Sequence, residues 1–235
     1  WGTNKIIIDS NGLNYQGNDD TYTVEYNTDG QSVNIVYSDA TKGWLPLEDD
    51  VTAEAPSPPP TQKAIFGFGY SGGYVSMTNL VSSSGVVATD VTGVGTARND
   101  LAAAGYGLDK ALFGYGYTGS LVSLTNLVNN SGVVATDVTG VGTARRALAA
   151  ASYGTDKAIF GYGSTSYSGG YLSMTNLVSS SGVVADDVTG VGTARNYPGA
   201  AGYGTDKAIF GYGTTGSNVS LTNLVSNVGV VSSDV

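Results

Sequence analysis

Short segments in which polar and apolar residues alternate recur along the chain, and turns that contain glycine separate them. In the segment 121–128, LVSLTNLV, the alternation predicts a strand whose Ser123 and Thr125 face away from a core. The core-facing positions of this strand are expected to be Val122, Leu124 and Leu127. Frequent glycine and β-branched residues disfavour helix, and even the Ala-rich segment 101–107, LAAAGYG, is too short to form one. The pattern therefore predicts an all-β protein.

Four near-copies of one sequence fill the chain from residue 63 onward. The copies begin at Lys63, Lys110, Lys157 and Lys207, with spacings of 47, 47 and 50 residues. Each copy divides into four strand-like segments, which in the second copy are 110–116, 121–128, 132–139 and the Ala-rich 148–154 that leads into the third. A four-stranded unit with this period is typical of a β-propeller blade.

The repeats from 63 to 235 resemble the kelch family of β-propellers. In each repeat a turn that ends in arginine is followed by small apolar residues, then by Asp-Lys, then by a KAIFGYG strand with paired glycines. The arginines are Arg98, Arg145 and Arg195. The resemblance implies four-stranded blades that stack face to face around a common axis. The first copy lacks the Ala-rich strand, so an arc continued by further residues is favoured over a closed four-bladed ring.

The first 62 residues contain no copy of the repeat. Residues 48–62, EDDVTAEAPSPPPTQ from Glu48 on, are rich in proline and predict an extended linker between two domains. Before the linker, strands are expected at 4–9, 21–27, 32–38 and Trp44, with a hairpin turn at 27–30.

This N-terminal β module, 1–47, resembles a module of bacteriophage tail fibres and other virion structural proteins. The residues that carry the resemblance are the IIIDSNG turn, the TYTVEYNTDGQSVNIVY hairpin and the KGW ending. The resemblance implies a β-rich and often homotrimeric assembly. Because the sequence begins at Trp1, we expect it to be a piece of a longer polypeptide.

The residues available for chemistry are few, because the chain contains no histidine and no cysteine. Ser-His-Asp or Cys-His nucleophiles and the usual zinc sites therefore cannot form. Most acidic residues of the repeats recur once per repeat, as scaffold residues do, and the two exceptions, Asp100 and Asp186, are interpreted as solvated side chains. The oxygen-rich spacing of segment 9–20 hints at calcium, but the segment lacks the bidentate acid and the glycine placement of an EF-hand loop. We expect no enzymatic activity, no metal and no cofactor.

The net charge and the hydropathy of the chain limit the kinds of partner that it is expected to bind. Ten Lys and Arg against 19 Asp and Glu give a formal charge of -9, which disfavours nucleic acid. No apolar run approaches the roughly 20 residues of a membrane helix, so membrane insertion is not expected.

Two further sets of residues recur at fixed positions in the repeats. Each repeat arginine is expected to pair with an aspartate of its own or the next blade and to fix a turn. The four strand phenylalanines could form a stripe for stacking sugars, but their spacing favours a core position: Phe66, Phe113, Phe160 and Phe210.

One hairpin loop varies between the repeats while the strands change little. The variable loops are 70–74, 117–120, 164–171 and 214–218, and in a propeller they would gather on one rim. Their Tyr, Ser, Gly and Thr content is typical of recognition loops. The candidate binding residues are Tyr70, Tyr74, Tyr117, Tyr167 and Tyr171. The alternative is that these loops vary without any binding role.

Three function classes follow from these features. The favoured one is a virion structural or appendage protein that contacts other copies of itself, virion proteins and a host-surface glycan or protein. The second is a secreted or cell-surface bacterial adhesin with the same blades. The third, a propeller enzyme, lacks the histidine and cysteine of copper oxidases and the Ser-x-Asp-x-Gly-x-x-Trp boxes of sialidases.

Overall fold

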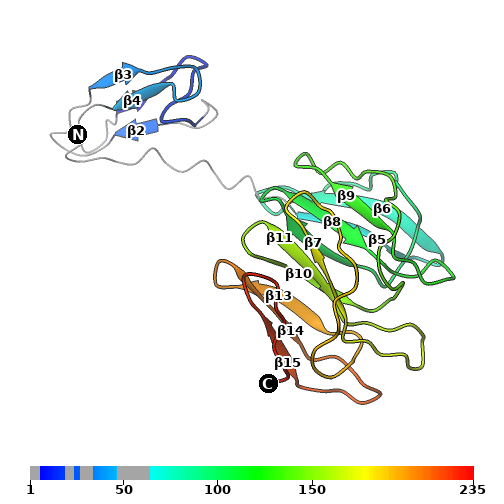
Figure 1. Cartoon of the computed structure of the whole chain (residues 1–235). Coiled ribbons are helices and arrows are strands. Elements are labelled where there is room, and N and C mark those ends of the chain that lie inside the picture. Colours follow the sequence, from blue (N-terminus) through cyan, green and yellow to red (C-terminus); the bar gives the residue numbers. More distant parts are fainter. Residues whose placement is uncertain (1–5, 19–23, 27–33, 47–63) are drawn as a thin grey trace. The chain divides into compact units, whose positions relative to one another are not determined.

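The computed structural model describes residues 6–18, 24–26, 34–46 and 64–235 (Figure 1). The chain divides into two compact units, Trp1–Gln62 and Lys63–Val235. All regular elements of the described residues are β-strands, which confirms the predicted all-β class. This part of the chain has no helix that is long and apolar enough to span a membrane. The predicted linker, 48–62, lies wholly outside the described residues, since nothing from 47 to 63 is described.

The N-terminal unit contains two small antiparallel sheets. Its strands are β1 (Ile6–Ile8), β2 (Val24–Tyr26), β3 (Ile35–Tyr37) and β4 (Trp44–Pro46). β1 pairs with β2 and β3 with β4, and each strand falls within or at a predicted segment. The rings of Tyr37 and Trp44 form a cross-strand pair with their centroids 5.5 Å apart. The predicted turn at 27–30 lies outside the described residues.

The second unit contains four antiparallel sheets, called here the first to fourth repeat sheets. The first consists of β5 (Ala64–Tyr70) and β6 (Tyr74–Val81), and the second of β7 (Ala102–Tyr106), β8 (Lys110–Gly114) and β9 (Thr125–Val128). The third consists of β10 (Ala149–Tyr153), β11 (Lys157–Gly161) and β12 (Thr175–Val178). The fourth consists of β13 (Gly199–Tyr203), β14 (Lys207–Gly211) and β15 (Thr222–Val225). The Ala-rich segments are therefore strands, as predicted.

The predicted segment 132–139 and its counterparts in the other repeats are present as a bridged edge rather than a continuous strand. In the second repeat, Val134 and Val138 form isolated bridges with Val128 and Thr125 of β9. One detail of the predicted alternation is wrong, because Thr125 is buried and does not face solvent. Its register partner across the sheet is Gly114, so Thr125 lies on the face that packs against Phe160 of the next sheet.

Successive repeat sheets pack against one another at a glycine (Figure 1). A phenylalanine of each sheet lies against a glycine of the preceding sheet, and the pairs are Gly67 with Phe113, Gly114 with Phe160, and Gly161 with Phe210. An ideal Cβ on Gly161 would lie 2.6 Å from Cζ of Phe210, so only glycine permits this approach. The three phenylalanines are buried, as predicted.

Phe66 departs from its three counterparts. Its side chain is 64% exposed, so the prediction of a core position is wrong for this residue. The reason is that no described sheet precedes the first repeat sheet, and the face that Phe66 occupies therefore has nothing to pack against.

An arginine is inserted between each pair of neighbouring repeat sheets. Each guanidinium lies over a ring of the preceding sheet: Arg98 over Phe68 at 4.3 Å, Arg145 over Tyr115 at 4.2 Å and Arg195 over Tyr162 at 4.0 Å from the ring centroid. All three arginine side chains are fully buried. A buried guanidinium needs partners for its donors as well as the ring, because an unpaired buried charge is very costly.

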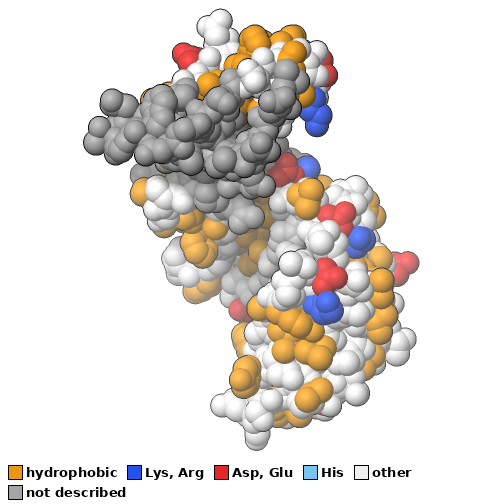
Figure 2. Space-filling view, turned by 90° about the vertical axis from the view of Figure 1, so that its left-hand side faces the viewer, with side chains coloured by type: hydrophobic (Ala, Val, Ile, Leu, Met, Phe, Trp, Pro, Cys, Tyr) orange, Lys and Arg blue, Asp and Glu red, His pale blue; other side chains and the backbone are white. Residues whose placement is uncertain are grey.

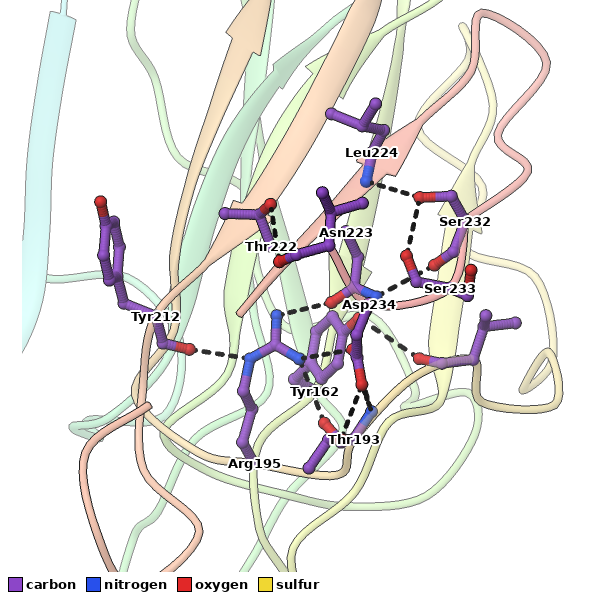
Figure 3. A network of polar contacts seen from close by, with 12 residues as sticks. Tyr162, Thr193, Arg195, Tyr212, Thr222, Asn223, Leu224, Ser232, Ser233 and Asp234 are labelled. Carbon is purple, nitrogen blue, oxygen red and sulfur yellow. Dashed lines mark hydrogen bonds and ion pairs between the residues drawn. The ribbon is translucent and has the colours of Figure 1, made fainter. Parts of the chain in front are cut away.

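Most partners of Arg195 come from the following sheet, as Figure 3 shows. Its Nε donates to the carbonyl oxygen of Tyr212 at 2.8 Å, and its Nη2 donates to Oδ1 of Asn223 at 2.7 Å. Nη1 donates to the carbonyl oxygen of Thr193 and lies 3.9 Å from Oδ1 of Asp234. The expected arginine–aspartate pairing is thus confirmed, with Asp137 and Asp187 in the equivalent positions for Arg98 and Arg145.

Arg98 and Asp187, which belong to two different arginine–aspartate pairs, both have shifted pKa values. Burial lowers the pKa of Arg98 to about 10, against the opposing attraction of Asp137, so the guanidinium remains charged at neutral pH. Partial burial raises the pKa of Asp187, but hydrogen bonds from Thr143 and Asn176 outweigh this effect and hold the pKa below its usual range.

Replacing the buried Arg145 by glutamine should destabilise the repeat unit strongly. Asp187 and the carbonyl oxygen of Tyr162 would lose their cationic partner, and we expect the free energy of unfolding to fall by about 3 kcal/mol. Urea denaturation would measure the change. The control is Lys157→Gln. The ion pair of Lys157 with Asp156 is solvent-exposed, so this substitution should lower the free energy of unfolding by less than about 0.5 kcal/mol. Equal effects of the two substitutions would contradict the proposed role of the buried arginine.

Replacing Gly161 by alanine should also destabilise the repeat unit, because the new methyl group would meet the ring of Phe210. We expect a loss of about 1–3 kcal/mol, as for overpacked cores. Gly211 provides a matched control, since its ideal Cβ meets only the Thr222 side chain, at 3.4 Å. Thermal unfolding of both variants would test this, and a stable Gly161→Ala protein would argue against the close approach.

Asp187→Asn should make the stability of the repeat unit less dependent on acid pH. Because the folded pKa of Asp187 lies below its unfolded value of about 3.9, the ionised carboxylate contributes stability above that value and loses it as pH falls through the folded pKa. The difference in unfolding free energy between wild type and variant should therefore be largest near pH 7 and shrink toward pH 2. Denaturation at several pH values would measure it, and a difference that stays constant would refute the assignment.

Candidate binding surface: a row of tyrosines

The variable loops of the repeat unit are fixed to the scaffold by backbone hydrogen bonds. Tyr117 exchanges two such bonds with Asn99, at 3.0 and 2.9 Å, and Ser164 exchanges two with Arg146. Thr214 is bonded in the same way to Asn196. Each of these loops therefore takes its position from the linker that precedes its own sheet, directly after the buried repeat arginine.

Four of the five candidate tyrosines form one continuous row of rings. Tyr70 is the last residue of β5 and Tyr74 is the first residue of β6, and their ring centroids are 5.6 Å apart. Tyr74 lies 6.0 Å from Tyr117 of the second repeat, and Tyr117 lies 5.2 Å from Tyr167 of the third. All three contacts are edge-to-face, which is the arrangement that aromatic quadrupoles favour.

Tyr171 is placed apart from these aromatic contacts. Its backbone bridges to Ser164 across the base of the third loop, and its hydroxyl lies near Gly216 in the fourth loop, 3.9 Å from the ideal Cβ position there. The fourth loop carries no tyrosine between 214 and 218, so the row is built by the first three repeats.

Arg146 lies beneath the row and was not singled out in the sequence. Its guanidinium carbon lies 3.4 Å from the ring centroid of Tyr167, and its Nη2 donates to the hydroxyl of Tyr197 at 2.8 Å. It also forms an ion pair with Asp100 through Nε and Nη2. The interpretation of Asp100 as a solvated acid is therefore wrong, because its carboxylate is largely covered by this arginine.

A signal for this cluster is present in the sequence. Arg146 occupies the position that Asn99 and Asn196 occupy in the neighbouring repeats, and Asp100 takes the place of Ala147 and Tyr197. Two unlike substitutions at adjacent positions of consecutive repeats, one basic and one acidic, indicate a charge pair. The linkers are in turn connected, because Ala147 donates its N–H to the carbonyl oxygen of Asp100.

The row combines apolar faces with neutral polar groups. Tyr70 and Tyr167 are each 62% exposed, whereas Tyr74 and Tyr117 are half-buried between them. Burial, followed by the neighbouring tyrosines and Asp100, raises the pKa of Tyr74, so its hydroxyl keeps its proton at neutral pH. Such a surface can stack against a ligand and donate hydrogen bonds to it.

Charged side chains elsewhere in the repeat unit largely neutralise one another. Lys110, Lys157 and Lys207 each contact the aspartate that precedes them, at 2.7–2.9 Å. Figure 2 shows basic and acidic side chains lying next to each other at several places on the visible face. The described residues contain no group of three or more acidic side chains that could hold a metal ion.

An open hollow of about 460 Å³ lies at the fourth loop. It is lined by Tyr197, Tyr212, Gly213, Thr214, Asn218 and Val219. Since the hydroxyl of Tyr197 is bonded to Arg146, which stacks on Tyr167, the hollow and the tyrosine row are connected through one arginine.

Comparison with known proteins does not assign a family or a function to the chain. No protein-family model matches the chain, and no curated protein is similar to it.

Proposed function

We propose that this chain is a non-enzymatic structural component of a virion, similar to a bacteriophage tail fibre, and that its repeat unit recognises a host surface. The repeat sheets are interpreted as kelch-like β-propeller blades arranged in an arc. The observation that carries the recognition role is the row of four tyrosines contributed by three repeats. The virion assignment rests on the resemblance of residues 1–47 to fibre modules, and by analogy with such fibres the chain assembles as a homotrimer on the particle.

The ligand that fits the row best is a neutral glycan. A sugar ring offers apolar C–H faces to tyrosine rings and hydroxyl groups to tyrosine hydroxyls, and Tyr pairs both functions with little rotamer entropy to lose. The cation beneath the row, Arg146, is already paired with Asp100. The chain as a whole carries a formal charge of -9, which disfavours acidic polysaccharides.

The position of the row also supports a recognition role. The loops of the second and third repeats, which carry Tyr117 and Tyr167, are each bonded to a linker that a buried arginine fixes. A ligand therefore meets rings whose positions are already set, and little ordering entropy is lost on binding. An extended polymer could contact all three repeats at once.

Binding to a panel of immobilised neutral and acidic glycans would test the recognition role. The triple variant Tyr70→Ser, Tyr117→Ser, Tyr167→Ser should lose at least about tenfold in affinity, because one well-packed ring contributes on the order of 1 kcal/mol or more. The matched control is Tyr37→Ser, which removes an exposed tyrosine of the N-terminal unit and should leave binding unchanged. Binding that survives in the triple variant, or binding of a protein ligand only, would contradict the glycan site.

The virion assignment needs a separate measurement. Antibodies raised against the chain should label an appendage of virus particles in electron micrographs. Labelling of a bacterial envelope without particles would favour an adhesin instead, and release of sugars from a bound glycan by the purified chain would refute the non-enzymatic role.

A further inference from the structure

The two ends of the repeat unit expose opposite halves of one contact. Between neighbouring sheets, the phenylalanine of the later sheet covers the glycine of the earlier one, and this contact occurs three times. At the start of the unit, Phe66 has no glycine to cover and is 64% exposed. At its end, Gly211 has no phenylalanine against it, and only the Thr222 side chain lies within 4 Å of its ideal Cβ.

The aromatic residue next to each glycine shows the same difference. Phe68, Tyr115 and Tyr162 each pack against the phenylalanine of the following sheet with ring centroids 5.1 Å apart. Tyr115 and Tyr162 are fully buried as a result. Tyr212 is the equivalent residue of the fourth repeat sheet, and it is 65% exposed.

A second set of contacts is also left open at both ends. Between neighbouring sheets, a leucine and a tyrosine of the earlier sheet lie against the glycine of a turn in the later one, as Leu177 and Tyr153 do at Gly229. Their counterparts in the fourth sheet, Leu224 and Tyr203, are 41% and 39% exposed. The counterpart of the turn glycine in the first sheet, Gly85, has no atom within 4 Å of its ideal Cβ.

We propose that the first repeat sheet of one chain docks onto the fourth repeat sheet of a second copy of this chain. Phe66 then covers Gly211 and Tyr212, and Leu224 and Tyr203 meet the turn at Gly85. The interface continues a packing geometry that the chain already contains three times, so it requires no new complementarity. Because the two surfaces differ, the contact is heterologous, and it closes into a ring or extends as a filament according to the rotation per chain.

The proposed contact between chains lacks one element of the contacts between sheets of one chain. Each internal interface contains an arginine between the sheets, but the sequence from 47 to 63 supplies no arginine to lie over Tyr212. The contact between chains is therefore weaker than the contact between sheets of one chain. It should be reversible and depend on protein concentration, independently of any homotrimer formed through the N-terminal unit and of the proposed glycan site.

Sedimentation velocity of the full chain over a range of concentrations would test the proposal with two single variants. Phe66→Ala removes the docking ring, and Gly211→Ala adds a methyl group where the internal counterparts, Gly114 and Gly161, leave only 2.6 Å to a phenylalanine ring. Phe66 is exposed, and Gly211, although buried, has room for a methyl group because its ideal Cβ meets only the Thr222 side chain, at 3.4 Å, so the melting temperature should not change. Each variant should weaken association at least tenfold.

Mixing the two variants gives the sharpest result. Phe66→Ala retains an intact fourth sheet and Gly211→Ala retains an intact first sheet, so the mixture should form a complex larger than either variant alone. Leu108→Ser, a control at a highly exposed turn residue, should associate like the wild type. The proposal is overturned if the wild type does not associate with concentration, if neither variant changes its association, or if the mixture forms no larger complex.

Hydroxyl-radical labelling would distinguish docking between two copies from closure of the first repeat sheet onto the fourth within one chain. Phe66 and Tyr212 should become protected as the wild-type concentration rises. Protection of both residues at the lowest concentration, in a species that does not associate further, would show closure within one chain and would refute docking between copies.

Discussion

The contact of a phenylalanine ring with a glycine of the preceding sheet sets the distance between successive repeat sheets, and the rest of the repeat unit depends on it. A sheet of three short strands is too small to bury both faces alone. With an ideal Cβ only 2.6 Å from the opposing ring, as at Gly114 and Gly161, no larger residue would leave the sheets this close. At this distance a guanidinium can lie over one sheet and bond to the backbone of the next, as Arg195 does.

The same spacing organises the candidate binding surface. Each buried arginine fixes a linker, the residue after it is hydrogen-bonded to the variable loop, and in the second and third repeats this loop carries Tyr117 and Tyr167. The 5.2 Å contact between Tyr117 and Tyr167 therefore reflects the spacing of the sheets below as much as the loops themselves. Sequence can change in the loops without disturbing the scaffold, because no loop residue takes part in the contact between glycine and phenylalanine.

The repeat made much of the fold predictable from sequence, and the exceptions occur where the repeat is broken. Strand character, the pairing of Arg98 with Asp137 and the burial of Phe160 follow from patterns that recur in every copy. Phe66 could not be assigned correctly, because its burial depends on a neighbouring sheet and not on its own strand. The exposure predicted for Thr125 is wrong because this residue lies beside Gly114 on the face that packs against the next sheet.

The tyrosines of the row could be predicted from the sequence, but their contacts with one another could not. The loops that vary could be read from the aligned copies, yet which tyrosines touch depends on loop length. The three extra residues of the third loop bring Tyr167 to Tyr117 and leave Tyr171 at the base of the loop. Arg146 and Asp100 were missed because each departure from the repeat was considered alone, whereas their opposite charges are informative only as a pair.

In a stack of repeats each internal sheet is stabilised by two neighbours, and a terminal sheet by one. On the exposed face of the fourth repeat sheet, Tyr212, Leu224 and Tyr203 are the same types of residue that are buried between the other repeat sheets. An outer face that keeps the residues of an internal interface has the composition of a contact surface, not of a surface adapted to water.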